Sequence, residues 1–130
     1  MIKKRILNTG RIRKITGGFS YIPHRFLSGG FLASLEQKEI LLYLFLILVS
    51  DRYGLSYYSY DIICSLIQLT LDEYIEAREG LLKKDLISFD GKIFQVLDLP
   101  AVPRCATSTF YEDPAVVARL IRQSLQEVRQ

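Results

Sequence analysis

The side chains best suited to do chemistry in this sequence are six cations close to its start. Residues 1–14, MIKKRILNTGRIRK, contain no acid and carry a charge of +6, whereas the whole chain carries +3, so residues 15–130 sum to −3. Clustered lysines and arginines neutralise phosphates, and affinity of this origin falls steeply as salt rises. The six cations are Lys3, Lys4, Arg5, Arg11, Arg13 and Lys14.

The same basic segment has two other interpretations. It could be a solvated tail that only aids solubility. Part of it could instead dock as a strand, because apolar residues alternate with the charges: Ile2, Ile6, Leu7, Ile12 and Ile15.

Other reactive side chains are too sparse to form a catalytic or metal site. His24 is the one histidine and is not part of a Ser, Cys or carboxylate constellation in the nearby sequence, and Cys64 and Cys105 lie far apart. The two Gly-Gly-Phe stretches, at residues 17–19 and 29–31, match no phosphate-binding loop and indicate turns. We therefore expect no enzyme activity, no cofactor and no metal.

Hydropathy indicates a cytoplasmic protein without a membrane segment. No apolar stretch typical of a secretory signal follows the basic start. The longest apolar run, ILLYLFLILV at residues 40–49, is well short of the roughly 20 residues that span a bilayer. Both cysteines are then expected to be reduced thiols, with Cys64 a small core residue.

The elements that would position the cations begin with a helix predicted over residues 34–50. Ser34 and Gln37 fit a capping box at its start, and Gly54 follows its end. The centre of this helix is apolar on every face, so it must be covered all round. That predicts either a central place in the domain or a subunit contact.

Two further helices are predicted after a short strand in LSYYS. Ser59 could cap the first, over residues 60–68, and Thr70 with Glu73 makes a capping box for the second, over residues 71–84. The short link QLT between them is typical of a helix-turn-helix. The side of the first expected to be buried consists of Ile62, Ile63, Leu66 and Ile67.

A β-hairpin is predicted next. Asp90-Gly91 separates LISF from KIFQVLDL, and such a pair favours a type I′ turn, in which both central residues have positive φ. The fold class is therefore mainly α with a small β-hairpin, or α+β.

The two ends of the chain flank this domain of residues 34–100. Residues 1–33 are predicted to be a basic arm and an irregular extension, whose apolar side chains should pack on the body. Those side chains are Phe19, Tyr21, Ile22, Phe26 and Phe31.

Residues 101–130 are predicted to form a linker and an amphipathic helix, capped by Asp113 with Pro114 at its first position. The apolar stripe of this helix could form a homodimer seam or fold back over its own domain. Its residues are Val117, Leu120, Ile121, Leu125 and Val128, beside Val116.

The order helix, strand, helix, turn, helix, hairpin over residues 37–99 resembles the winged helix-turn-helix superfamily. The stretch from LLYLFLILVSDRYG to LLKKDLI is similar to the N-terminal winged domains of replication-initiation and primosome proteins of bacteria, phages and plasmids, and to small transcription regulators. The resemblance implies DNA contacts from the third helix and the wing.

That third helix departs from the pattern, because its outward positions are mostly acidic. Residues 70–85 hold five acids against three cations, a net −2, which is unusual for a helix that reads DNA. By helical spacing, its expected core positions are Tyr74, Ala77 and Leu81. Leu71, Ile75 and Leu82 widen this apolar face, which could pack on the chain's own ends or form a protein-binding groove. The positions where DNA-contacting residues would fall are Leu71, Asp72, Ile75, Glu76 and Glu79.

Two functions remain open from the sequence. The first is a winged-helix protein that binds double-stranded DNA, in replication initiation or transcription control of a bacterial mobile element, with Lys83, Lys84, Lys92 and Arg104 assisting the arm. The second is a protein-interaction module in which Asp72, Glu76 and Glu79 face a basic partner.

Overall fold

A computed structural model describes residues 2–104 of the chain. The elements, in order, are η1 (Thr9–Arg11), α1 (Arg25–Ser28), η2 (Leu32–Ser34), α2 (Gln37–Val49), β1 (Leu55–Ser56), α3 (Tyr60–Ile67), α4 (Leu71–Lys83), β2 (Ile87–Phe89) and β3 (Phe94–Val96). The predicted C-terminal helix, its cap and its dimer stripe at Val117, Leu120, Ile121, Leu125 and Val128 lie outside the described residues.

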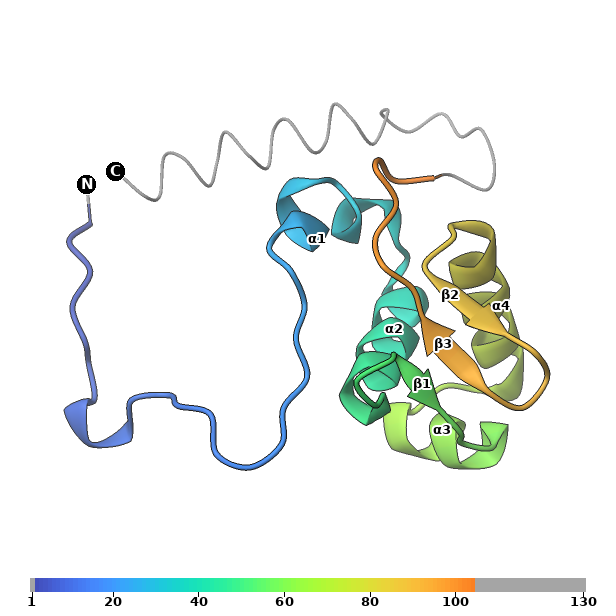
Figure 1. The fold of residues 1–130 in the computed structure, drawn as a ribbon, viewed down its shortest axis with the longest axis horizontal. Helices are drawn as coiled ribbons and strands as arrows, with labels where there is room; N and C mark the ends of the chain where they lie inside the picture. The colour runs from blue at the N-terminus through green and yellow to red at the C-terminus, as the bar shows by residue number, and fades with distance from the viewer. Residues whose placement is uncertain (1, 105–130) are drawn as a thin grey trace.

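Helix α2 lies at the centre of the folded part, with α3, α4 and the sheet packed around it (Figure 1). Leu42 and Leu46 are fully buried, which confirms a central position for this apolar helix. Leu44 and Leu48 remain exposed in residues 2–104, so the described chain covers the helix on three sides and leaves one apolar strip open.

The predicted start of this helix at Ser34 is wrong. Ser34 ends the short turn η2, and Leu35 is extended at ψ 146°, so the helix begins only at Gln37 with Glu36 as its N-cap. The carboxylate of Glu39 accepts the backbone N–H of Glu36 at 2.7 Å, which satisfies one of the open donors of the first turn. The capping pair, Glu36 with Glu39, therefore lies two residues later than the sequence suggested.

Helices α3 and α4 are joined by Gln68, Leu69 and Thr70, as expected for a helix-turn-helix. Gln68 adopts a left-handed conformation with φ 58°, which ends α3 and turns the chain. The Thr70 hydroxyl accepts the Glu73 N–H at 3.1 Å, and the Glu73 carboxylate accepts the Thr70 N–H at 2.9 Å. The predicted capping box is confirmed.

The buried side predicted for α3 is right for two of its four residues and wrong for the other two. Ile63 is fully buried and Ile67 packs partly against the core, but Ile62 and Leu66 are exposed. Cys64 is half-buried beside them, and burial raises the pKa of its thiol. The helix therefore contributes a narrow face to the core.

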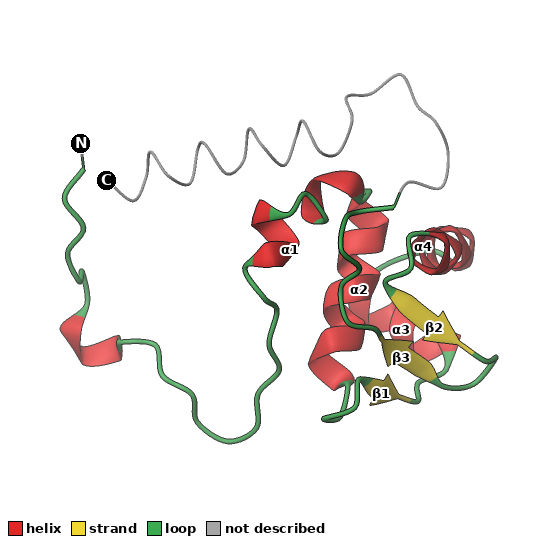
Figure 2. Cartoon of the chain, turned by 45° about the horizontal axis from the view of Figure 1, so that its top comes forward, coloured by secondary structure: helices red, strands yellow, loops and turns green. Residues whose placement is uncertain are grey.

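Three short strands form an antiparallel sheet in the order β1-β3-β2 (Figure 2). Phe89 pairs with Phe94, so residues 90–93 form a four-residue loop and the hairpin is confirmed. The type I′ turn is wrong, because only Gly91 has a positive φ, at 103°. The Asp90 carboxylate instead holds the loop, accepting the N–H of Lys92 at 2.9 Å and of Ile93 at 2.7 Å.

In the extension before α2, only the second half packs against the folded body. Phe26 and Phe31 are buried, and the Phe26 ring stacks with those of Phe31 and Tyr43. Phe19, Tyr21 and Ile22 are exposed, so the predicted packing of these three is wrong. Arg25 donates to the carbonyl oxygens of Leu99 at 2.8 Å and Pro100 at 2.7 Å. This pair of hydrogen bonds ties α1 to the segment that follows the sheet.

The predicted fold class is confirmed: residues 2–104 are mainly helical with a small antiparallel sheet. The core consists of side chains from α1, α2, α3, α4 and the sheet together. In α4, Tyr74, Ala77 and Leu81 are the buried positions, as the helical spacing predicted.

Candidate functional site

The six arm cations, Lys3, Lys4, Arg5, Arg11, Arg13 and Lys14, are all exposed in an extended segment. None of them forms an ion pair with any carboxylate of residues 2–104. The single turn η1 interrupts the arm, where the Asn8 side chain accepts the Gly10 N–H at 3.1 Å. Their positive charge is therefore not neutralised by the described part of the chain.

The arm runs away from the folded body (Figures 1 and 2). Ile2, Leu7 and Ile15 are more than 60% exposed, and residues 2–24 contain no strand, so the alternative of a docked strand is wrong. Close to the body, the Ser20 hydroxyl lies 3.5 Å from the carbonyl oxygen of Leu48. The charges are thus carried on a segment with little packing of its own.

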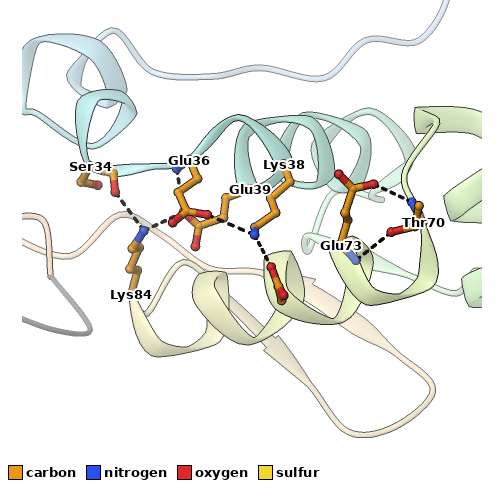
Figure 3. Close-up of polar contacts among 8 residues, drawn as sticks. Ser34, Glu36, Lys38, Glu39, Thr70, Glu73 and Lys84 are labelled. Atoms are coloured by element: carbon orange, nitrogen blue, oxygen red, sulfur yellow. Dashed lines mark hydrogen bonds and ion pairs between the residues drawn. The ribbon is translucent and has the colours of Figure 1, made fainter.

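Lys84 was expected to assist the arm, and its position corrects that prediction. Its Nζ donates to Glu39 Oε1 at 2.6 Å and to the Ser34 carbonyl oxygen at 2.9 Å, with the Lys84 side chain 12% exposed and that of Glu39 4% exposed (Figure 3). An ammonium that is mostly covered and already paired with a carboxylate is poorly placed to contact a phosphate. Lys84 joins α4 to the start of α2 instead.

The other three cations expected to assist the arm, Lys83, Lys92 and Arg104, differ in whether they form ion pairs. Lys83, at the end of α4, and Lys92, in the β2–β3 loop, are exposed and have no ion pair with a described residue. Arg104 pairs with Asp85 at 3.4 Å, with both side chains largely exposed. Lys83 and Lys92 therefore remain available to a ligand, and Arg104 would first have to leave Asp85.

Two of the three acids proposed as a partner surface on α4 already have partners within the chain. Glu76 forms an ion pair with Lys38 of α2, as Figure 3 shows by the dashed line from Lys38. That contact and the neighbouring Glu36 raise the pKa of Lys38, because both favour its charged form. Glu79 pairs with Arg78 at 3.2 Å, which leaves Asp72 exposed without an ion pair among residues 2–104.

An aromatic hollow of about 560 Å³ lies between the start of α3, one face of α4 and the β2–β3 loop. Tyr57 and Tyr60 are 70% and 56% exposed. Leu71 and Ile75 are partly exposed, so residues 2–104 leave the widened part of the apolar face of α4 incompletely covered. The described lining contains cations but no carboxylate. It consists of Tyr57, Tyr58, Ser59, Tyr60, Leu71, Tyr74, Ile75, Arg78, Phe89, Gly91 and Lys92.

Arg78 occupies one wall of this hollow between two rings. Its guanidinium carbon lies 5.5 Å from the centre of the Tyr74 ring and 5.2 Å from that of Phe89. Its Nε is buried and has no hydrogen-bond acceptor among the described residues. Burial raises the pKa of Tyr74, and the neighbouring Arg78 partly offsets that rise. The hollow thus combines ring faces with a fixed positive charge.

The sequence interpretation missed this hollow, although one signal pointed to it. Residues 57–60, YYSY, place three tyrosines within four positions beside the helix-turn-helix, and tyrosine is a side chain that recurs at binding surfaces. Tyr74 and Phe89 complete the set from α4 and β2, far away along the chain. Only folding brings those two beside the YYSY stretch.

The arm leaves the folded body on the side opposite the β2–β3 loop (Figure 2). The described helices include none with the length and apolar character that a membrane crossing requires. Residues 2–104 also hold no cluster of three or more side chains suited to binding a metal ion.

Comparison with protein-family models, with curated proteins and with solved structures finds no match for this chain.

Proposed function

We propose that this chain binds double-stranded DNA, with the arm cations as the main source of affinity. The observation that carries the proposal is that all six are exposed and that none is paired with a carboxylate of residues 2–104. Cations in that state attract the counterion-rich phosphate backbone, and release of those counterions on binding supplies affinity.

Helix-turn-helix geometry supports the same proposal. Helix α4 follows α3 after three residues and is followed by the β2–β3 hairpin, which is the order expected of a winged helix. In that interpretation, Lys83 and Lys92 add phosphate contacts from the end of α4 and from the wing. From the resemblance described above, the proposed process is replication initiation or transcription control of a bacterial mobile element.

A homodimer is part of the proposal through the predicted C-terminal helix. A two-fold pair would place two arms on one duplex and so double the phosphate contacts. The function as a protein-interaction module is less well supported, because Glu76 and Glu79 already form ion pairs with Lys38 and Arg78 of the same chain.

The test is a titration of a fluorescein-labelled duplex, followed by anisotropy over a series of salt concentrations. Six arm contacts would give a slope of about −5 for log K against log salt, because each phosphate contact contributes about −0.9. Replacing all six cations with glutamine should weaken binding sharply at low salt and remove most of that slope.

The matched control keeps the charge and changes the side chain: Lys3→Arg, Lys4→Arg and Lys14→Arg together. It should bind the duplex about as well as the unmodified chain. If the glutamine variant bound as tightly as the unmodified chain, the arm would have no role and the proposal would fail.

A further inference from the structure

We propose that the aromatic hollow binds an unpaired nucleobase of single-stranded DNA, with the adjoining phosphate at Lys92. This inference goes beyond duplex binding by the arm and rests on the proposed function only for the choice of nucleic acid as ligand. The hollow and the arm are separate surfaces, so each can be tested alone.

The hollow is lined by aromatic rings on which a base could stack. Tyr57 and Tyr60 expose most of their surface to solvent, and Tyr58, Tyr74 and Phe89 line the same hollow. Aromatic side chains bind single strands by stacking on bases, and every base offers a π face, so such binding tolerates any sequence. Exposed tyrosines gathered on one surface suit that kind of ligand.

Both charged residues among the described lining, Arg78 and Lys92, are positive. Arg78 pairs with Glu79, which lies outside the lining, so the unpaired positive charge at the hollow is that of Lys92. A cationic ligand, such as a lysine-rich or arginine-rich peptide, would be repelled, whereas a flat ligand attached to a phosphate is attracted. The buried Nε of Arg78 adds a donor that lacks an acceptor within residues 2–104.

The volume of the hollow and its open entrance also suit a single nucleobase. About 560 Å³ falls within the range of roughly 300–1,000 Å³ typical of small-ligand sites, which accommodates a base with its sugar. Gly91 forms part of the rim, and a side chain there would meet no heavy atom within 4 Å, so the loop leaves the entrance open. A base inside a duplex cannot enter without being unstacked, which favours a single strand.

The experiment measures binding of a labelled oligothymidylate by anisotropy at a salt concentration where the arm contributes little. The double variant Tyr57→Leu/Tyr60→Leu keeps apolar surface and removes two exposed rings. The matched control is Tyr53→Leu, because Tyr53 is 65% exposed and has Arg52 over its ring but lies outside the hollow. Circular dichroism and thermal melting verify that each variant is folded.

The double variant should bind the single strand at least about fivefold more weakly, since stacking on one aromatic side chain is commonly worth that much. Tyr53→Leu should bind like the unmodified chain, and Lys92→Gln should show a smaller loss that disappears at high salt. Equal binding by the double variant, an equal loss in Tyr53→Leu, or no binding of oligothymidylate by the unmodified chain would each overturn the proposal.

The variant with a neutralised arm separates this failure from failure of the proposed function. If it loses duplex binding but keeps single-strand binding that depends on Tyr57 and Tyr60, both proposals stand. If the arm is irrelevant to duplex binding and the tyrosine effect remains, only the duplex proposal fails. If duplex binding depends on the arm but single-strand binding does not depend on Tyr57 and Tyr60, only the proposal for the aromatic hollow fails.

Discussion

Lys84 of α4 and Glu39 of α2 form a buried ion pair, with Nζ 2.6 Å from Oε1. The same carboxylate accepts the N–H of Glu36 and so caps α2, while the same ammonium donates to the Ser34 carbonyl oxygen (Figure 3). One contact therefore sets where α2 begins and fixes how α4 packs against it.

Removing the ammonium should destabilise the fold without reducing DNA affinity of the folded protein. Lys84→Met leaves the Glu39 carboxylate buried and unpaired, and breaking such a pair costs about 3–5 kcal/mol. Chemical denaturation measures the loss. Lys83→Met is the matched control, because Lys83 is the exposed neighbour and should leave the free energy of unfolding almost unchanged. Equal stability of the two variants would contradict the role assigned to Lys84.

Gly80 provides the space in which the Glu39 carboxylate sits. A Cβ at position 80 would overlap Glu39 Oε2 and lie 2.9 Å from its Cδ. Gly80→Ala should therefore destabilise the protein by about 1–3 kcal/mol, as overpacking does. That sign is opposite to the gain of about 1 kcal/mol expected from helix propensity alone.

A double-mutant comparison isolates this contact. In a chain that carries Glu39→Ala, the same Gly80→Ala change should cost much less, because the carboxylate it would strike is gone. Thermal melting of the four proteins measures the difference. A cost that is identical in both backgrounds would show that Gly80 does not act through Glu39.

Reversing two charges on α4 should leave duplex binding equal or stronger. The variant Glu76→Lys/Glu79→Lys removes partners of Lys38 and Arg78 and adds positive charge to the face of α4. The expected effect on stability is small, because Glu76 and Glu79 are at least half exposed and such pairs are screened by water. Anisotropy with the labelled duplex measures affinity. Loss of duplex binding in a folded variant would instead favour a role for these acids in recognition.

Stability should fall in acid through two carboxylates that accept backbone hydrogen bonds. The N–H and hydroxyl of Thr70 lower the pKa of Glu73 below its ordinary 4.5, and the N–H groups of Ile93 and Lys92 lower that of Asp90 below 3.8. A depressed folded-state pKa means that the stabilisation is present above those ordinary values. It is lost as the pH falls through the lower folded-state values.

The variants Glu73→Gln and Asp90→Asn test this dependence, because an amide oxygen still accepts a hydrogen bond but does not titrate in this range. Between neutral pH and acid, each variant should lose less stability than the unmodified chain, as measured by denaturant unfolding at several pH values. A parallel loss in variant and unmodified chain would show that other groups cause the acid sensitivity.

Features that depend on neighbouring residues were predictable. The Thr70–Glu73 capping box, the break between α3 and α4, and the hairpin each follow from side chains within a few positions of one another. The spacing of Tyr74, Ala77 and Leu81 likewise identified the buried side of α4, because helical period alone places them together.

Errors arose where burial or pairing depends on distant residues. The spacing of Ile62 and Leu66 matched a buried face, but residues 2–104 supply no cover for that side of α3, so both are exposed. In the sequence, Lys84 is indistinguishable from its free neighbour Lys83. In the structure, its ammonium donates a hydrogen bond to Glu39, which is 45 positions away.

By itself, the sequence determined the positions of the helices, the turn and the hairpin, and the concentration of charge in the arm, because these follow from local hydrogen bonding, helical period and composition. Tertiary structure alone decided which charges are free, which apolar side chains are covered, and which aromatic rings meet in one hollow. The physical reason is that pairing, cover and cavity shape are contacts between distant segments, and their energies exist only once the chain has closed around α2.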